Sequence, residues 1–265
     1  MNNSADGMYV VHDGRPDAPP LLLLHGSAGT GGFWKPMVPM LAGHRHVLRV
    51  DLPGYGRSAP ASSYDVPAQA GRVAAVLDDL GLRHVAVAGH SSGGWAGIAL
   101  AEQRPDLVGS LTLISTGPSL DSVRPDPLLV RALMAPPLGP LVWPRRTDAM
   151  MRRGINSMCA RPVVIPDDVL AEMRGLGYGR MRALMRQNVA YLAERSAPER
   201  LAALDVPVLV IFGDADPRYR VSMAHRYEQV AGARLELLPG VGHMPIFESP
   251  EQTAKLLLGF VAQRT

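Results

Sequence analysis

Short apolar runs alternate with amphipathic stretches along most of this 265-residue chain. The apolar runs are typical of strands that are covered on both faces of a parallel sheet. In the amphipathic stretches apolar residues recur at helical spacing, and glycine or proline marks the ends. The predicted strands are residues 8–12 (an opening edge strand), 21–25, 47–50, 85–88, 111–115, 206–212 and 235–238, and the predicted helices are residues 33–41, 67–80, 93–104, 221–230 and 251–262. This alternation predicts an α/β fold with a doubly wound, mostly parallel sheet.

The pattern changes between residues 119 and 200, where strand-like alternation stops and proline, methionine and arginine become frequent. We expect residues 1–118 and 201–265 to form the core and residues 119–200 to form a helical lid over the carboxyl edge of the sheet. Seven of the thirteen methionines lie here, and they either pack the helices of the lid or suit an elongated apolar substrate. Thirteen arginines and eight acidic residues give this stretch a net charge of +5. The arginines are either solvated at the surface, or they favour acidic substrates.

Composition narrows the class of protein. Hydrophobic residues make up 47% of the chain, yet no apolar stretch reaches the about 20 residues of a membrane span. Cys159 is the only cysteine, so neither an intrachain disulfide nor a cysteine-based metal site can form. The first residues lack a signal-peptide pattern, and we therefore expect a cytoplasmic location. The net charge of +3 comes without a basic run interleaved with aromatics, so nucleic acid is not an expected partner. The oligomeric state is left open.

A serine lies at the centre of the pentapeptide Gly89-His90-Ser91-Ser92-Gly93, between a buried strand and a helix. This G-x-S-x-G pattern is typical of a strained turn that lifts the serine hydroxyl clear of the sheet. The flanking glycines are needed because side chains there would collide with neighbouring backbone. The pattern predicts Ser91 as a nucleophile.

A serine hydroxyl needs a base to take its proton, and the base works best when an acid orients it. Both residue types follow strands after residue 200. His243 follows Gly242 after the strand at residues 235–238, whereas Asp214 and Asp216 both follow the strand at residues 206–212. Because the carboxyl ends of parallel strands meet at one edge of a sheet, these groups should converge on Ser91.

At this point the chain resembles the α/β-hydrolase superfamily over residues 8–118 and 200–265. The resemblance depends on five ordered motifs: His25-Gly26, Asp51-x-Pro53-Gly54-x-Gly56-x-Ser58, the Gly89–Gly93 elbow, Gly213-x-x-Asp216 and Gly242-His243. It implies the α/β-hydrolase fold with a helical lid inserted after the sixth strand. Ser91 would be the nucleophile, His243 the general base and then acid, and Asp216 the orienting acid. Asp214 would then be a turn residue, and residues 51–58 a loop that supports the site.

The resemblance also implies an oxyanion hole. One donor would be the backbone N–H of Ser92, and the other the N–H of Ser27, whose side chain should matter less than its amide. We expect a small-molecule substrate, without a metal or an organic cofactor. His25 and His90 are expected to support loops around the site or to touch the substrate. The candidate substrate contacts are Gly26, Phe33, His90, Trp143 and Met244.

The expected reaction is transfer of an acyl group from Ser91 to water, with an ester, lactone or thioester as substrate. Members of this superfamily with a serine triad also include carbon–carbon bond hydrolases, perhydrolases and cofactor-free haloperoxidases, acyltransferases and lyases. Methionine at position 244, where a tryptophan would favour the ring-cleavage carbon–carbon hydrolases, points away from those. A non-catalytic small-molecule receptor on the same fold is the alternative from a different class.

Overall fold

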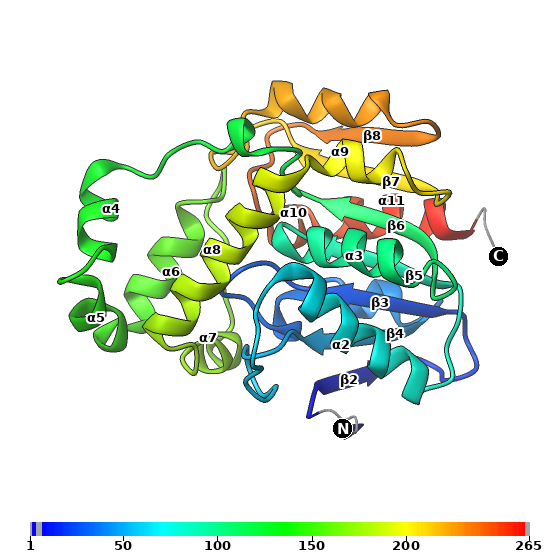
Figure 1. Ribbon diagram of the computed structural model, residues 1–265, viewed down its shortest axis with the longest axis horizontal. Coiled ribbons are helices and arrows are strands. Elements are labelled where there is room, and N and C mark those ends of the chain that lie inside the picture. The colour runs from blue at the N-terminus through cyan, green and yellow to red at the C-terminus, as the bar shows by residue number, and fades with distance from the viewer. Residues whose placement is uncertain (1, 4–6, 263–265) are drawn as a thin grey trace.

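The computed structural model describes residues 2–3 and 7–262, and one twisted sheet runs through the whole of this part (Figure 1). Apolar runs form its central strands because both faces of the sheet are covered by helices. In the described chain the strands are β1 (Asn2–Asn3), β2 (Tyr9–Asp13), β3 (Pro20–Leu24), β4 (His46–Asp51), β5 (Val85–His90), β6 (Val108–Ile114), β7 (Val208–Gly213) and β8 (Ala233–Leu238).

The strand order is β1-β2-β4-β3-β5-β6-β7-β8. In this order all neighbouring strands from β4 to β8 are parallel. The strand β2 pairs antiparallel with β4, and β1 pairs antiparallel with β2. The doubly wound, mostly parallel sheet predicted from the sequence is therefore confirmed. The prediction that residues 8–12 form the edge strand is wrong, because β1 pairs along the outer side of β2. Two asparagines carry no apolar pattern that could have revealed β1.

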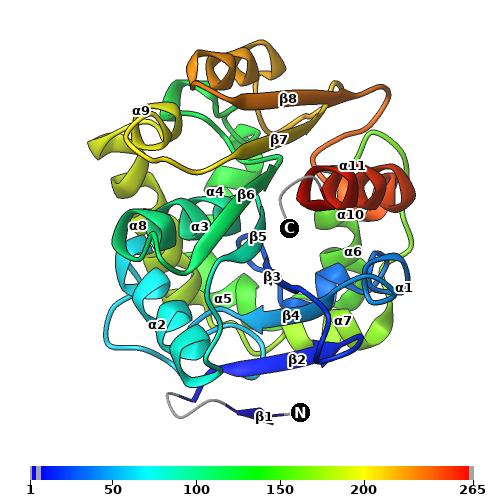
Figure 2. The ribbon, with the colours of Figure 1, turned by 90° about the vertical axis from the view of Figure 1, so that its right-hand side faces the viewer.

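Helices cover both faces of this sheet (Figure 2). In Figure 2, α2 and α3 lie on one side and α1, α10 and α11 on the other, each side enclosing a separate apolar core. Their bounds are α1 (Val38–Leu41), α2 (Val66–Asp79), α3 (Ser92–Gln103), α10 (Pro245–Glu248) and α11 (Pro250–Ala262), with 3-10 helices η1 (Gly31–Trp34) and η4 (Val221–Gln229).

One predicted helix is split in the structure. Instead of a single helix over residues 33–41, the chain forms η1 and then α1, joined by a turn at Lys35 to Met37. Pro36 and Pro39 are the physical reason, because proline has no N–H to donate and its ring clashes with the preceding helical turn. The predicted helix at residues 221–230 is present as the tighter 3-10 form, η4.

The inserted segment, residues 119–200, leaves the sheet after β6 and returns before β7. It forms η2 (Leu120–Ser122), α4 (Leu128–Met134), α5 (Gly139–Val142), η3 (Trp143–Arg145), α6 (Asp148–Asn156), α7 (Asp167–Met173), α8 (Tyr178–Glu194) and the start of α9 (Ala197–Leu201). Helices α4 to α8 gather at one end of the sheet (Figure 1). Among the described residues, none of the helices has the length and apolar character to cross a membrane.

Candidate active site

The strand-to-helix turn after β5 holds Ser91 in a strained conformation. Its φ is 51°, in the left-handed region that side chains other than glycine rarely adopt. The glycines on either side allow the sharp turn. A Cβ on Gly89 would lie 2.4 Å from the Gly93 carbonyl oxygen, and one on Gly93 would lie 2.3 Å from that of Leu24. The turn therefore presents the Ser91 side chain at the carboxyl end of β5.

His243 reaches Ser91 from the loop after β8. Its Nε2 lies 3.2 Å from the Ser91 Oγ, and its Nδ1 lies 2.9 Å from the Asp216 Oδ2. Because a carboxylate only accepts, Nδ1 carries a proton, and in the neutral ring Nε2 then has a free lone pair toward Ser91. Both His243 and Asp216 are buried, which strengthens these contacts by excluding water. The structure therefore places the three residues in one hydrogen-bonded chain.

The two candidate acids have different surroundings. Asp216 uses its second oxygen to accept the backbone N–H groups of Arg218 at 2.7 Å and Tyr219 at 3.1 Å. Asp214 is exposed and accepts the backbone N–H of Gly240 at 2.7 Å. Asp216 therefore faces the histidine, and Asp214 closes the turn between β7 and the loop after β8.

The two other histidines near the site are buried and neutral. The His90 Nε2 donates to the His243 carbonyl at 2.9 Å, and burial lowers the pKa of His90 to about 3. The His25 Nδ1 donates to the Gly26 carbonyl at 2.9 Å, its Nε2 accepts the Leu52 N–H at 3.0 Å, and burial lowers the pKa of His25. Both rings thus connect loops around Ser91. Contact of His90 with a substrate stays a prediction.

The loop after β3 lies directly against the elbow. A Cβ on Gly26 would lie 3.0 Å from the Ser91 Cβ and 2.9 Å from the His90 Nδ1, so only glycine fits. Ser92 is the first residue of α3, where a backbone N–H has no acceptor within the helix. The hydroxyl oxygens of Ser27 and Ser92 are 2.9 Å apart. The two residues predicted to form the oxyanion hole are therefore neighbours beside Ser91.

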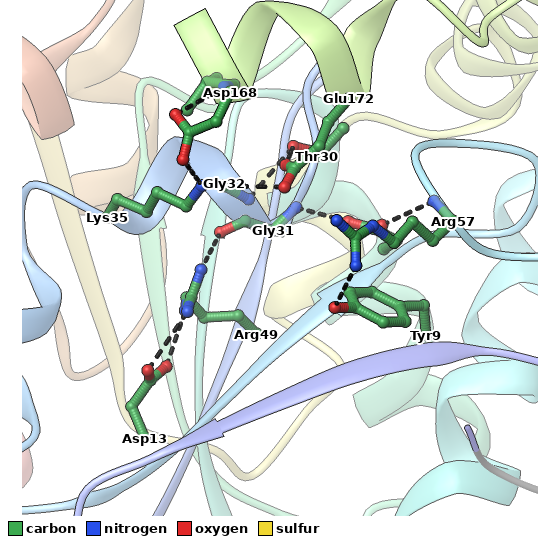
Figure 3. A network of polar contacts seen from close by, with 12 residues as sticks. Tyr9, Asp13, Thr30, Gly31, Gly32, Lys35, Arg49, Arg57, Asp168 and Glu172 are labelled. Atoms are coloured by element: carbon green, nitrogen blue, oxygen red, sulfur yellow. Dashed lines mark hydrogen bonds and ion pairs between the residues drawn. The ribbon is translucent and has the colours of Figure 1, made fainter. Parts of the chain in front are cut away.

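Polar contacts from β2 and β4 fix the far end of this loop (Figure 3). Asp51 accepts the backbone N–H groups of Gly31 at 2.7 Å and Arg57 at 2.9 Å. Arg49 donates to the Gly31 carbonyl at 3.2 Å and forms an ion pair of 2.7 Å with Asp13. Since Asp51 and Arg49 are both buried, these contacts hold the loop rigidly.

The same loop is connected to α7 of the inserted segment (Figure 3). The Thr30 hydroxyl donates to Glu172 at 2.8 Å, and the Lys35 ammonium lies 2.6 Å from Asp168 and 3.7 Å from Glu172. The inserted segment therefore contacts the part of the chain that follows β3, at Thr30 and Lys35.

The remaining candidate contacts lie in packed surroundings. Phe33 is buried edge-on against Phe247, with ring centroids 5.6 Å apart. The Trp143 indole donates to a backbone carbonyl of the inserted segment at 2.7 Å, and the Arg146 guanidinium lies 4.2 Å from its ring centroid. Met244 is fully buried next to His243. Trp143 is thus held by its own segment, and its contact with a substrate stays a prediction.

Two residues that the sequence did not single out also support the site. The buried Glu248 accepts the backbone N–H groups on both sides of His243, from Gly242 at 3.0 Å and Met244 at 3.1 Å, and that of Ala160 at 2.7 Å. It therefore fastens the histidine loop to the inserted segment. A glutamate five residues after the histidine was visible in the sequence, but nothing local indicated its partners.

Tyr219 is the second residue that supports the site without having been singled out from the sequence. Its ring lies 5.4 Å from that of His243, and its hydroxyl is close enough to Ser91 and Gly117 for them to influence its pKa. Burial raises the pKa of Tyr219 to about 12, so the hydroxyl keeps its proton and can act as a donor. In the sequence, only its position three residues after Asp216 could have indicated that Tyr219 lies near the site.

A cavity of about 1160 Å³ opens on the outer side of Asp216. Three arginines and three aspartates line it, and Arg218 forms an ion pair of 2.5 Å with Asp126. Met158, whose carbonyl accepts the His243 N–H at 2.8 Å, also lines it. Neither Ser91 nor His243 lines this cavity. Among the described residues, no cluster of three or more histidine, cysteine or acidic side chains could hold a metal ion.

Comparison with known proteins identifies the class. The model of the alpha/beta hydrolase family matches residues 21–256, so the chain belongs to this family. A pimeloyl-acyl-carrier-protein methyl ester esterase from Neisseria meningitidis is 30% identical, over 93% of this chain and 95% of the esterase. The carboxylesterase CesB from Bacillus subtilis matches with a TM-score of 0.78 and 23% identity, over 98% and 90% of the two chains. A meta-cleavage product hydrolase from Pseudomonas fluorescens matches with a TM-score of 0.77 and 19% identity, over 97% and 95%. At these identities the two structures show the shared fold, and the protein is an enzyme of the hydrolase class.

Proposed function

We propose that this enzyme is a serine hydrolase that cleaves a carboxylic ester-type bond of a small, mainly apolar molecule through an acyl-enzyme on Ser91. One observation carries the proposal: the strained Ser91 lies 3.2 Å from a histidine nitrogen whose ring is oriented by a buried carboxylate. The similarity to a methyl ester esterase supports the ester as substrate class, since that relative covers nearly the whole chain.

In the first half-reaction His243 Nε2 takes the proton of the Ser91 hydroxyl as Oγ attacks the carbonyl carbon. Asp216 stabilises the imidazolium that forms. When the tetrahedral intermediate collapses, His243 gives the proton to the leaving oxygen or sulfur, and the acyl group stays on Ser91. Water then attacks the acyl-enzyme, His243 takes its proton, and the carboxylic acid leaves as Ser91 regains its hydrogen.

The negative charge that develops on the carbonyl oxygen needs donors fixed in advance. We assign this role to two backbone N–H groups, that of Ser27 in the loop after β3 and that of Ser92 at the start of α3. A donor aimed at a developing oxyanion contributes several kcal/mol, because it does not have to reorganise during the reaction.

The inserted segment, residues 119–200, is proposed to act as the lid that shapes the substrate site. Its support is the set of contacts that Glu172 and Asp168 of α7 make with the loop after β3. The methionines of this segment suit an apolar acyl group.

A panel of aryl esters with increasing acyl length tests this proposal, with Ser91→Ala as the matched inactive variant. We expect turnover that peaks at one chain length in the wild type and disappears in the variant. Labelling of Ser91 by a fluorophosphonate without turnover of any ester, lactone or thioester would contradict the ester assignment and indicate another triad reaction. Wild-type turnover in Ser91→Ala would refute the mechanism.

A further inference from the structure

A series of hydrogen-bonded side chains connects the inserted segment to the predicted oxyanion hole. The Asn188 amide on α8 donates to the Ser27 Oγ at 3.0 Å, across 161 positions of sequence. The Ser27 and Ser92 hydroxyl oxygens lie 2.9 Å apart. Ser27 is therefore the junction of this series.

The donors and acceptors allow a direction through these side chains, from Asn188 to Ser27 and on to Ser92. An Asn188 N–H can only donate, so one lone pair of the Ser27 oxygen is used in accepting it. The Ser27 hydroxyl proton is then free to point to the Ser92 oxygen. The contact joins the two residues whose backbone N–H groups we assign to the oxyanion hole, and it limits how far these two groups can move apart.

Asn188 is a buried polar residue on an otherwise apolar helix face, which packing alone does not explain. The other buried residues of α8 are Leu184, Tyr191 and Leu192, which lie on the same face at helical spacing. Burying a polar side chain in such an apolar stripe is unfavourable unless it is hydrogen-bonded. A leucine of similar size would fill the same space without that cost.

We propose that Asn188 and the Ser27 hydroxyl are positioning residues, which together hold the Ser27 and Ser92 amides at the separation that the oxyanion requires. This inference rests on the proposed function. It assigns a role to the side chain of Ser27, whereas the sequence predicts a role only for its backbone amide. It also makes the oxyanion hole depend on the docking of α8, so that the site is complete only when the inserted segment is in place.

The test uses the full chain and four variants: Ser27→Ala, Asn188→Leu, the double variant, and the exposed Ser62→Ala as a matched control. We expect kcat to fall about tenfold to a hundredfold in each single variant with KM nearly unchanged, because only transition-state contacts are weakened. The double variant should lose no more than Ser27→Ala alone, since Asn188 acts through Ser27. Thermal unfolding of Asn188→Leu should occur at the wild-type temperature or above it, and Ser62→Ala should keep wild-type kcat.

A second readout is inhibition by an alkylboronic acid, whose adduct on Ser91 carries a tetrahedral anionic centre. Its affinity should fall by the same factor as kcat in both single variants. Asn188→Ala provides a second variant if the leucine does not fold.

Unchanged kcat in folded Asn188→Leu, or additive losses in the double variant, would overturn the inference. If the wild-type enzyme neither reacts with a fluorophosphonate nor turns over any ester, the proposed function fails instead.

Discussion

Replacing Asp216 by asparagine keeps the shape of the side chain but exchanges one oxygen for an NH2 group. The Asp216 Oδ1 accepts two backbone N–H groups, from Arg218 and Tyr219. The asparagine must leave its carbonyl oxygen at that position, because an NH2 group there would face two donors. Its NH2 group therefore turns to the Nδ1 of His243. This forces Nδ1 to accept and moves the ring proton to Nε2, where it blocks proton transfer from Ser91.

The size of the effect follows from this wrong tautomer. Where an acid-to-amide change has this consequence in a serine triad, kcat falls about 10⁴-fold. That factor corresponds to about 5 kcal/mol of lost transition-state stabilisation. Burial increases the effect here, because the Asp216 side chain is fully buried and water cannot replace the missing acceptor.

The assay compares kcat for the best aryl ester in Asp216→Asn and in Asp214→Asn. The second variant is the matched control, since Asp214 is exposed and its amide oxygen can still accept the Gly240 N–H. We expect a loss of about 10⁴-fold in the first and less than about twofold in the second. Circular dichroism should show both variants folded. A larger loss in Asp214→Asn, or a loss below about tenfold in Asp216→Asn, would refute this reasoning.

Three further predictions follow from the supporting residues. Glu248→Gln places an NH2 group among backbone donors. It should lower the free energy of unfolding, measured by urea unfolding, by about 2–3 kcal/mol, and it should also lower kcat in steady-state kinetics. Unchanged stability would contradict the role of Glu248. Tyr219→Phe removes the hydroxyl next to Ser91 and should lower kcat about threefold to tenfold without changing the unfolding temperature, whereas an unaltered kcat would show that the hydroxyl is idle. Burial lowers the pKa of His90 from 6.5 to about 3, so between these pH values the folded state binds fewer protons than the unfolded state. The stability that the neutral His90 contributes is therefore complete above pH 6.5 and is lost as the pH falls toward 3. His90→Gln should therefore reduce the acid loss of stability by up to about 1.4 kcal/mol per pH unit, and an unchanged slope in urea unfolding between pH 6.5 and 4 would exclude this contribution.

The parts of the fold that were predictable have local causes. An apolar run such as Leu21 to Leu24 is typical of a strand covered on both faces, and the glycines around Ser91 indicate a sharp turn. Because carboxyl ends of parallel strands share one edge, even the meeting of Ser91, Asp216 and His243 follows from the order of strands.

The parts that were not predictable depend on partners distant in sequence. Asn188 is not distinguished by any motif in the sequence, and its contact with Ser27 spans 161 positions. Glu248 likewise binds the N–H of Ala160, 88 positions away. Such contacts exist only once the inserted segment is docked on the sheet, and no local pattern encodes that docking. The split of the predicted helix at residues 33–41 has a local cause, because Pro36 and Pro39 interrupt its hydrogen bonding.

The intact mass of the protein after exposure to a fluorophosphonate tests the central claim most directly, with peptide mapping to locate the adduct. An activated serine should react once, at Ser91, and the Ser91→Ala variant should remain unmodified while it stays folded. An adduct on another residue of the wild-type enzyme, or modification of folded Ser91→Ala to the same extent, would contradict the assignment of Ser91 as the nucleophile.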